Sequence, residues 1–426
     1  MIKQVKQRIE QIRRGEVPEG YKKTKVGIVP AEWVEHKLSY YLTVNNDKNT
    51  DLKYTKDDVF SISGELGIVN QIELLGRSYA GASVAPYGIV YPNDVVYTKS
   101  PLKANPYGII KTNKLGVTGI VSTLYAIYHC KDNVSPDFVQ QYFESDHNLN
   151  NYLYPIVNIG AKHDMKISDE GSLRGIVAFP PLPEQEKIAE ILTAQDRVIE
   201  LYEKKIEQLK KLKKAFLQKM FPKPGATVPE WRFPGFTGEW EKRKLGDVTV
   251  SYSGGTPTAG KSEYYGGNIP FIRSGEISQD YTESFITECG LKESSAAMVN
   301  KGDILYALYG ATSGEVNRSK IHGAINQAIL AILPNAGYDP EYLTQLLRMK
   351  KQSIVDTYIQ GGQGNLSGTI VKGLCIDLPC YDEQIQVGKT LANYDKLITL
   401  HQQKCDEEKQ KKKALMQFLL TGIVRV

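Results

Sequence analysis

The stretch that decides the fold is EQEKIAEILTAQDRVIELYEKKIEQLKKLKKAFLQKM at residues 184–220, which recurs at residues 383–419 as EQIQVGKTLANYDKLITLHQQKCDEEKQKKKALMQFL. The two stretches align without a gap at a constant shift of 199, and 12 of the 37 aligned residues are identical. Biased composition alone would match only a few of them. A second echo lies upstream, because Trp33 with Leu38 recurs as Trp240 with Leu245. The sequence therefore predicts two tandem copies of one module and not a short-period solenoid.

Apolar residues at alternating spacings of four and three run along both stretches, and this is the pattern of a coiled-coil seam. In the first helix the predicted pairing residues are Ile188, Leu192, Ile199, Ile206, Leu209, Phe216 and Met220. In the second helix they are Val387, Leu391, Ile398, Leu415 and Leu419, with a polar stretch in the middle. At 1.5 Å per residue each helix would span roughly 55 Å. We expect the two helices to pair antiparallel and to set the distance between the two bodies, although they could be stabilising struts only.

Each copy opens with a body in which short apolar runs alternate with turns rich in Gly, Pro and Asn, as in β-strands. Each body also contains helical patterns; residues 135–153 read as one helix opened by Ser135-Pro136. We predict an α+β fold, in which two globular domains of mixed β-sheet and helices are separated by two long antiparallel coiled-coil helices, with pseudo-twofold duplication. The predicted segments are an N-terminal helix and linker (1–28), a first body (29–183), a first long helix (184–226), a second body (227–380) and a second long helix (381–426).

Composition and charge limit the possible function. The 426 residues carry a net charge of only +5, so the chain is not a histone-like polycation. The five cysteines are scattered without metal-ligand spacing, which favours free thiols in a reducing cytosol. No stretch approaches 18 uncharged apolar residues, and the N-terminus lacks the apolar core of a secretory signal. We expect a cytoplasmic protein that does not contact a membrane.

Two short motifs resemble catalytic sites but lack the required context. Residues 255–262, GTPTAGKS, fit the P-loop pattern, yet the next eight residues contain two glycines and a proline and cannot begin the helix that a P-loop needs. Asn105-Pro106-Tyr107-Gly108 is similar to the base-holding loop of amino-methyltransferases but lacks one proline, and no methyl-donor loop accompanies it. The six histidines form no metal-ligand spacing with one another or with the cysteines. The sequence therefore predicts a protein that binds and does not catalyse.

Several phrases, taken in order, carry a family resemblance over nearly the whole chain. The phrase Leu-Pro, Glu-Gln, Leu, Asp, Ile at the head of each long helix occurs at residues 182–199 and again at 378–398. Further marks are Gly254-Gly255-Thr256-Pro257, Lys301-Gly302-Asp303-Ile304-Leu305, Asn326-Gln327 and the closing Leu420-Thr421-Gly422-x-Val424-Arg425-Val426. On these residues the chain resembles the specificity (S) subunit of type I restriction-modification systems.

The resemblance implies that two target-recognition domains each read one half of a split, asymmetric target in double-stranded DNA, while the paired helices set the unread spacer. It implies two methylating (M) subunits that dock on the helices and modify adenine N6, and two restriction (R) subunits. S-adenosylmethionine, ATP and Mg²⁺ would serve those partners, and this chain would bind no cofactor or metal and have no catalytic residues. The Gly-Gly-Thr-Pro phrase occurs only in the second body, and the first body instead reads ISGELGIVNQ at residues 62–71. The two target halves should therefore differ.

Candidate DNA contacts are polar residues in loops between strands, because base edges and phosphates are contacted by Arg, Lys, Asn, Gln, Ser and Thr. In the first body they are Ser63, Arg77, Lys99, Lys103, Lys111, Lys114, Lys162 and His163. In the second body they are Thr256, Lys261, Arg273, Arg318, Lys320, Gln327, Gln363 and Asn365. Most surface lysines are simply solvated, so the alternative for each of these residues is a surface side chain that does not contact DNA. For the whole chain the competing interpretation is a duplicated scaffold that joins partners without reading DNA.

Overall fold

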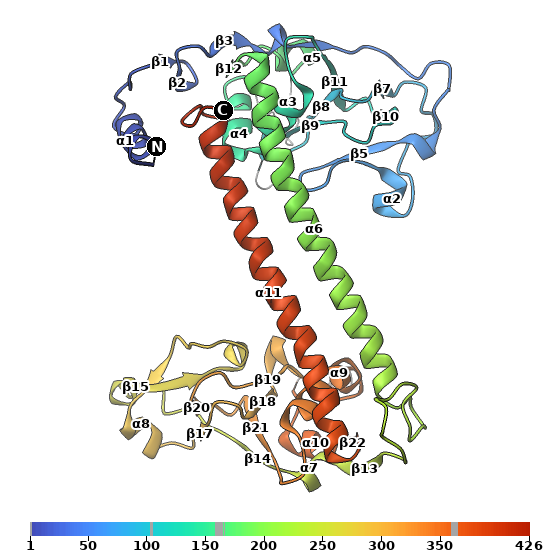
Figure 1. Cartoon of the computed structure of the whole chain (residues 1–426), viewed down its shortest axis with the longest axis vertical. Helices are drawn as coiled ribbons and strands as arrows, with labels where there is room; N and C mark the ends of the chain where they lie inside the picture. Colours follow the sequence, from blue (N-terminus) through green and yellow to red (C-terminus); the bar gives the residue numbers. More distant parts are fainter. Residues whose placement is uncertain (1, 103–104, 158–164, 166, 359–364) are drawn as a thin grey trace. The chain divides into compact units, whose positions relative to one another are not determined.

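The structure is a computed structural model that describes all residues except 1, 103–104, 158–164, 166 and 359–364. The chain divides into two compact units. Unit 1 comprises Met1–Tyr202 with Lys404–Val426, and unit 2 comprises Glu203–Gln403. Two helices of 39 residues, α6 (Leu182–Met220) and α11 (Tyr381–Leu419), each contribute residues to both units (Figure 1).

The remaining helices are short, apart from α9. Those of unit 1 are α1 (Ile2–Arg13), α2 (Gln71–Leu75), α3 (Pro136–Glu144), α4 (Asp146–Leu153) and α5 (Asp169–Ser172). Those of unit 2 are α7 (Leu245–Val248), α8 (Glu288–Lys292), α9 (Pro340–Tyr358) and α10 (Gly368–Lys372). The strands of unit 1 are β1 (Tyr21–Thr24), β2 (Gly27–Pro30), β3 (Val34–Lys37), β4 (Leu42–Val44), β5 (Phe60–Ser63), β6 (Gly67–Asn70), β7 (Gly88–Val90), β8 (Val95–Thr98), β9 (Ile109–Thr112), β10 (Gly119–Val121), β11 (Tyr125–Cys130) and β12 (Ile176–Phe179). The strands of unit 2 are β13 (Glu241–Lys244), β14 (Thr249–Ser253), β15 (Tyr265–Ile272), β16 (Phe285–Ile286), β17 (Ala297–Val299), β18 (Ile304–Ala307), β19 (Val316–Arg318), β20 (Gly323–Ile325), β21 (Ile329–Pro334) and β22 (Cys375–Leu378).

Both units contain the same antiparallel main sheet. Its strand order is β4-β11-β8-β9 in unit 1 and β14-β21-β18-β19 in unit 2. The inner strands β8 and β18 are buried along their whole length, which explains why they read as continuous apolar runs in the sequence. A two-stranded ladder, β3–β12 in unit 1 and β13–β22 in unit 2, precedes each long helix. The duplicated α+β architecture predicted from the sequence is confirmed.

The two units differ in the structure added to this common frame. Unit 2 has a second four-stranded sheet of order β16-β15-β20-β17, in which β15 and β20 are parallel. Unit 1 has two separate two-stranded ladders, β5–β6 and β7–β10, in its place. The two bodies therefore differ outside the shared sheet.

Each unit buries one end of both long helices in its core. The main core of unit 1 packs Ile188 and Leu192 of α6 with Leu419 of α11. The main core of unit 2 packs Met220 of α6 with Leu391 of α11. Because the start of one helix meets the end of the other in each unit, the helices run antiparallel there, as predicted.

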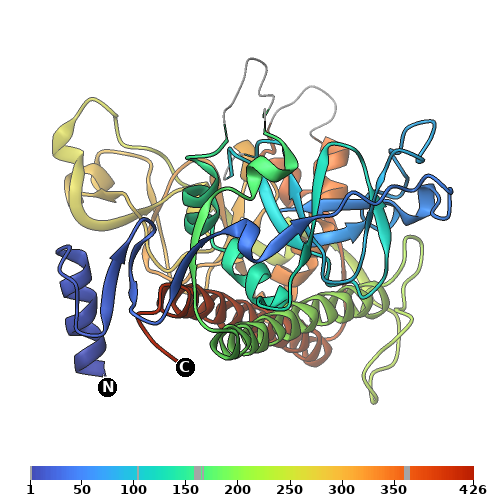
Figure 2. The same cartoon turned by 90° about the horizontal axis from the view of Figure 1, so that it is seen from above.

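Two local predictions were wrong. Residues 135–153 form two helices and not one, because Ser145 is extended and its hydroxyl accepts a hydrogen bond from the backbone N–H of Asn148 to begin α4. The segment expected to be a linker after α1 contains β1, which pairs with β2 as a hairpin (dark blue in Figure 2).

Neither a membrane-spanning helix nor a metal-binding cluster occurs among the described residues. No helix among them has the length and apolarity to span a membrane. No group of three or more His, Cys, Asp and Glu side chains among them could hold a metal ion.

Candidate nucleic-acid interface and helix-docking contacts

One end of the main sheet in unit 2 gathers predicted DNA-contacting residues. Strand β14 ends there at Ser253, β18 ends at Ala307 and β21 begins at Ile329. Thr256 follows β14, and Gln327 precedes β21. The hydroxyl of Thr256 donates a hydrogen bond of 2.6 Å to Oε1 of Gln327. Two residues that the sequence analysis selected separately are therefore in direct contact.

The loop before α10 reaches the same end of the sheet. The backbone N–H of Leu366 donates to the carbonyl oxygen of Leu308 (3.0 Å), and the N–H of Leu308 donates to that of Ala328 (2.8 Å). Exposed Asn365 is thereby placed near the turn that carries Gln327. Gln363, in the same predicted loop, lies outside the described residues. We call the residues gathered here the sheet-end cluster: Thr256, Gln327 and Asn365.

Two glycines let the Thr256 loop approach the sheet. A Cβ on Gly254 would lie 1.8 Å from the carbonyl oxygen of Ile325, and one on Gly255 would lie 1.9 Å from Oγ of Ser295. Any larger residue would push the loop away from β20. The Gly-Gly-Thr-Pro phrase is thus a close-packing device that presents Thr256.

The same geometry explains why residues 255–262 are not a P-loop. A single 3₁₀ turn, Ser262–Tyr264, follows the glycines, and β15 begins at the next residue. The segment therefore lacks the helix N-terminus that would face phosphates. Lys261 is exposed and donates to the hydroxyl of Tyr264 at 2.8 Å.

The corresponding end of the sheet in unit 1 has different chemistry. Lys99 directly follows β8, and its Nζ lies 2.6 Å from Oδ1 of Asp169, the first residue of α5. Unit 1 therefore has a partly neutralised cation, Lys99, at this end of the sheet, where unit 2 has the side chains of the sheet-end cluster. Lys103, Lys162 and His163 lie outside the described residues.

The other unit 1 candidates are spread over the surface. The hydroxyl of Ser63 accepts hydrogen bonds from two backbone amides of the β5–β6 turn, so it has a structural partner. Exposed Arg77 stacks over the ring of Tyr79, 4.6 Å from its centroid. Exposed Lys114 pairs with Asp137 at 2.6 Å.

Lys111 has a structural role that the sequence did not reveal. Its side chain lies on β9, is buried, and ends 2.8 Å from Oε1 of Glu144 on α3. The ammonium group therefore satisfies a carboxylate inside the unit and does not face solvent. This burial argues against the predicted DNA contact, and we drop Lys111 from the candidate contacts.

Arg273 is held by acids. It is exposed and forms ion pairs of 2.7 Å with both Glu276 and Glu283. Burial would raise the pKa of the Glu276 carboxyl, but the hydrogen bonds that it accepts from Arg273 and Thr282 outweigh burial and lower that pKa to about 2. Arg273 thus contributes little free charge to a DNA contact.

The last two unit 2 candidates differ in availability. Arg318 donates to the carbonyl oxygen of Gly302 at 2.9 Å and lies 3.5 Å from Glu341. Its guanidinium group is therefore already used in part by contacts within unit 2. Lys320 is exposed. The structure therefore leaves Lys320 accessible to a phosphate while Arg318 supports the sheet.

The predicted helix stripe is mostly shielded from solvent. In α6 the buried members are Ile188, Leu192, Ile199, Ile206, Leu209 and Met220, and Phe216 is half-buried. In α11 Val387, Leu391 and Leu419 are buried, and Ile398 and Leu415 are half-buried. The ring of Phe216 contacts that of Tyr394, with centroids 5.4 Å apart.

The repeated glutamine at the head of each long helix makes the same contact twice. Oε1 of Gln185 accepts the backbone N–H of Ser135 (3.0 Å), and Oε1 of Gln384 accepts that of Asp339 (3.0 Å). Each glutamine also donates to the carbonyl oxygen of the proline five residues before it, at 2.9 Å. The contact joins the N-terminus of a body helix, α3 or α9, to a long helix in both units.

The repeated aspartate binds a lysine of the other long helix. In unit 1 Asp196 accepts from Gln141 of α3 (2.8 Å) and pairs with Lys412 of α11 (2.5 Å). Helix pairing and attachment of the body thus share one carboxylate.

In unit 2 Asp395 has the equivalent partners and one more. It accepts from Gln345 of α9 (2.8 Å), pairs with Lys213 of α6 (2.5 Å), and lies 3.1 Å from Arg348 of α9. The additional arginine gives this carboxylate two cations where the unit 1 carboxylate has one.

The repeated glutamate binds an arginine that the sequence analysis missed. In unit 1 the nearly buried Glu184 pairs with Arg425 at two oxygens and accepts from the indole N–H of Trp33 (3.3 Å). In unit 2 the buried Glu383 accepts 2.8 Å and 2.6 Å bonds from Arg232. The two arginines do not correspond at the shift of 199. Arg425 belongs to the closing phrase that carried the family resemblance, but neither that phrase nor the repeated glutamate predicted the pairing.

Comparison with known proteins agrees with this architecture. Residues 237–409 match the type I restriction modification DNA specificity domain. The type I restriction enzyme MjaIX specificity subunit of Methanocaldococcus jannaschii is 32% identical over 168 residues, which are 38% of this chain and 39% of that protein. The MjaVIII specificity subunit of the same organism is 27% identical over 275 residues, 59% of this chain and 62% of that protein. The chain thus matches less than two thirds of the length of these curated relatives.

A solved structure gives the same fold. The S subunit of a type I restriction-modification system from M. genitalium superposes with a TM-score of 0.61 at 14% identity, covering 91% of this chain and 96% of that one. Together with the sequence matches, this confirms the resemblance to type I specificity subunits that the sequence predicted.

Proposed function

We propose that this chain, whose residues 237–409 belong to the type I DNA specificity family, is the DNA-reading subunit of a type I restriction-modification complex. Units 1 and 2 each read one half of a split target in double-stranded DNA. The chain itself catalyses nothing. Two methylating subunits transfer a methyl group from S-adenosylmethionine to adenine N6, and two restriction subunits use ATP and Mg²⁺.

One observation carries the proposal: the main sheet and the helix contacts are duplicated, while the loop ends of the sheets differ. Unit 2 presents the sheet-end cluster, and unit 1 presents Lys99 beside Asp169. A scaffold that only joined partners would have no use for two unlike loop ends on one duplicated frame. Two unlike half-sites need this combination.

The sheet-end cluster has the chemistry for reading base edges. Gln and Asn side chains make bidentate hydrogen bonds to adenine in the major groove, and a threonine can serve either base type through its hydroxyl or methyl group. Each good bidentate pair discriminates against a wrong base by about 1–3 kcal/mol. An exposed lysine such as Lys320 supplies a sequence-independent phosphate contact, whose contribution falls as salt rises.

The long helices provide the attachment for partners and set the spacer. Each of them belongs to both units, and each unit fixes its body to them through a glutamine and an aspartate. Lengthening α6 and α11 together by whole helical turns should therefore lengthen the spacer and leave both half-sites unchanged. An unchanged spacer would refute this role.

The proposal is tested by co-expressing the chain with its cognate methylating subunit and mapping N6-methyladenine across the host DNA by single-molecule sequencing. We expect one split motif with two unlike halves around a fixed spacer. A stable, active complex that methylates no defined motif would favour the scaffold interpretation instead.

The assignment of unit 2 to one half-site is tested with the double variant Thr256→Ala, Gln327→Ala. We expect recognition to relax at one half of the motif and to stay unchanged at the other half, because the sheet-end cluster belongs to unit 2 alone. The matched control is Thr258→Ala, which removes an exposed threonine two residues away. If both halves relaxed, the independence of the two units would be wrong.

A further inference from the structure

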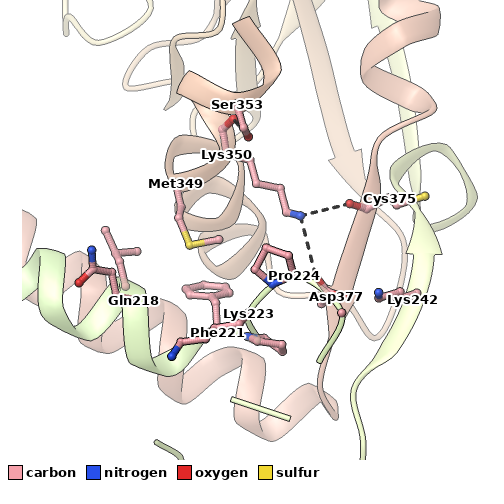
Figure 3. A pocket seen from close by; sticks show the side chains of 13 residues that line it. Gln218, Phe221, Lys223, Pro224, Lys242, Met349, Lys350, Ser353, Cys375 and Asp377 are labelled. Atoms are coloured by element: carbon pink, nitrogen blue, oxygen red, sulfur yellow. Dashed lines mark hydrogen bonds and ion pairs between the residues drawn. The ribbon is translucent and has the colours of Figure 1, made fainter. Parts of the chain in front are cut away.

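Unit 2 contains a pocket of about 550 Å³ where the C-terminal end of α6 meets α9 and β22. Leu217 and Phe221 line it from α6 and the residue that follows, Met349 and Lys350 from α9, and Cys375 and Asp377 from β22 (Figure 3). None of these residues takes part in the sheet-end cluster or in the duplicated helix contacts. The pocket therefore requires an account of its own.

The pocket combines an apolar floor with a cationic wall. Phe221 and Met349 supply apolar surface, and Lys223, Lys242 and Lys350 also line the pocket. One lining side chain, Asp377, is acidic. Lys350 lies 3.8 Å from that carboxylate and donates to a backbone carbonyl oxygen at 3.4 Å (Figure 3).

Lys242 is the cation left to a ligand. Lys223 already pairs with Glu230, which lies outside the lining. Lys242 is exposed on β13, opposite Asp377 in the strand register, and none of the described acidic residues forms an ion pair with it. After pairing, the pocket retains positive charge next to apolar surface.

The wall of the pocket is preformed. Residues 222–225 read Pro-Lys-Pro-Gly, and the two prolines fix their own backbone angles. The backbone N–H of Ala226 donates to the carbonyl oxygen of Lys223 (2.9 Å), and that of Trp231 donates to the carbonyl oxygen of Lys219 (2.9 Å). A ligand would therefore bind without first ordering this loop, which favours affinity.

The repeat places a hollow at the same point of unit 1, with different chemistry. Met416 and Gln417, the counterparts of Leu217 and Gln218 at the shift of 199, line a cavity of about 700 Å³ there. That cavity is lined by acids, including Asp146, as well as by lysines. The site is thus duplicated in position, and it differs in charge balance: the unit 2 pocket has three lysines and one acid, whereas the unit 1 cavity has three lysines, one histidine and two acids.

We propose that the unit 2 pocket is a docking site for a segment of the methylating partner in which a carboxylate side chain lies next to a bulky apolar one. The inference rests on the proposed function. A DNA phosphate would satisfy the lysines but leave the Phe221 and Met349 surface uncovered, so charge and shape together favour a protein segment. The pocket also continues from the C-terminal end of α6, which the proposed function assigns to partner attachment.

The pocket contains its own reporter, because Cys375 is exposed there and Cys289 is exposed on α8 elsewhere in unit 2. The experiment measures alkylation of both thiols by mass spectrometry in the full chain, alone and with the purified methylating subunit. We expect alkylation of Cys375 to become roughly tenfold slower in the complex, since protection follows burial, while Cys289 is unaffected. Equal alkylation of Cys375 in a stable complex would overturn the docking site and leave the proposed function intact.

Two further arms separate the alternatives. Lys242→Glu should weaken binding of the methylating subunit about tenfold, with Lys292→Glu as a control that makes the same charge change on exposed α8. No weakening would overturn the role given to Lys242. Protection of Cys375 by duplex DNA alone would identify a phosphate as the occupant and refute a protein segment. If no complex forms at all, both this inference and the proposed function fail.

Discussion

The two units bind their equivalent carboxylates, Glu184 and Glu383, with arginines from different parts of the chain. In unit 2 the chain runs without a break from the end of α6 through Arg232 to Trp240, so the arginine that binds Glu383 sits in a continuous connection. In unit 1 the arginine that binds Glu184 is Arg425, at the far end of the sequence, while Trp33 approaches from the other end.

Noncovalent contacts replace the missing connection in unit 1. The hydroxyl of Tyr21 donates to the carbonyl oxygen of Gly422 (2.7 Å), Arg8 donates to that of Ile423, and Arg425 pairs with Glu32 (2.7 Å). Both units therefore place an arginine against the repeated glutamate, although the two arginines come from different parts of the chain. This difference predicts that unit 1 is the more easily opened of the two.

The largest expected effect comes from removing residues 421–426. The deletion leaves the buried Glu184 without its arginine, which alone should cost about 1–3 kcal/mol, and it also removes the buried side chain of Ile423, worth about 1.5–3 kcal/mol. The contacts of Tyr21 and Arg8 are lost as well. Amide hydrogen exchange read by mass spectrometry should show faster exchange in α3 of unit 1 and unchanged exchange in α9 of unit 2. Equal loosening of both helices would contradict the separate closure of the units.

The second prediction compares the two arginines directly. Arg232→Ala should destabilise unit 2 by about 3–5 kcal/mol, because the side chains of Arg232 and Glu383 are 13% and 1% exposed. Arg425→Ala should cost unit 1 less, about 1–3 kcal/mol, since Arg425 is 36% exposed and Glu184 keeps the bond from Trp33. Thermal unfolding with exchange in each unit measures both. Arg243→Ala, which breaks an exposed pair on β13, is the control and should leave stability nearly unchanged.

The third prediction concerns the lysines that join the helices. Lys412→Met should destabilise unit 1 by about 1.5–3 kcal/mol, because of the two contacts described for Asp196 only that with the neutral Gln141 remains. Lys213→Met should cost unit 2 less, since Arg348 still neutralises Asp395. Urea unfolding of the two variants and of the double variant Lys213→Met, Arg348→Met tests this order. The double variant should then cost at least as much as Lys412→Met, because Arg348 also donates to the carbonyl oxygen of Val316 and to Asn317. A result near that of Lys213→Met would refute the argument.

The smallest expected effect separates backbone strain from close packing. Gly422 and Gly225 both have positive φ, +70° and +87°, so alanine at either site carries a conformational cost of roughly 1–2 kcal/mol. At Gly422 the added Cβ would also lie 2.4 Å from Cδ of Pro30, whereas nothing lies within 4 Å at Gly225. Thermal unfolding should therefore show a larger loss for Gly422→Ala than for Gly225→Ala. Equal losses would mean that the closure of unit 1 tolerates displacement of its terminal segment.

The main architecture could be predicted from the sequence because it depends on patterns among residues that are close together in the chain. The gapless repeat and the 4-and-3 spacing of Ile188, Leu192 and Ile199 define the long helices, and continuous apolar runs define inner strands such as β18. Ser145 caps α4 and so divides one predicted helix into two. The sequence shows that a serine able to cap a helix stands there, but it does not show that a new helix begins. Local chemistry permits a cap there, and tertiary packing chooses it.

The candidate site was only partly predictable, since its geometry depends on residues distant in sequence. Thr256 and Gln327 were selected from separate phrases, and their contact depends on two strands ending at one edge. Lys111 looked like its exposed neighbour Lys114 because a sequence does not show which face of β9 packs on α3. Arg232 and Arg425 escaped the repeat alignment because each lies at a different distance after its helix.

The division of residues between the units has a consequence for synthesis on the ribosome. Unit 2 is one contiguous segment, Glu203–Gln403, whereas unit 1 needs Lys404–Val426 in addition to the first 202 residues. Domains usually fold in the order in which they are made. Here the second body can finish first, while Glu184 and Trp33 wait for an arginine that is translated after both bodies. A nascent chain that stalls soon after residue 403 would thus carry a complete unit 2 beside a unit 1 that still lacks the Arg425 contact.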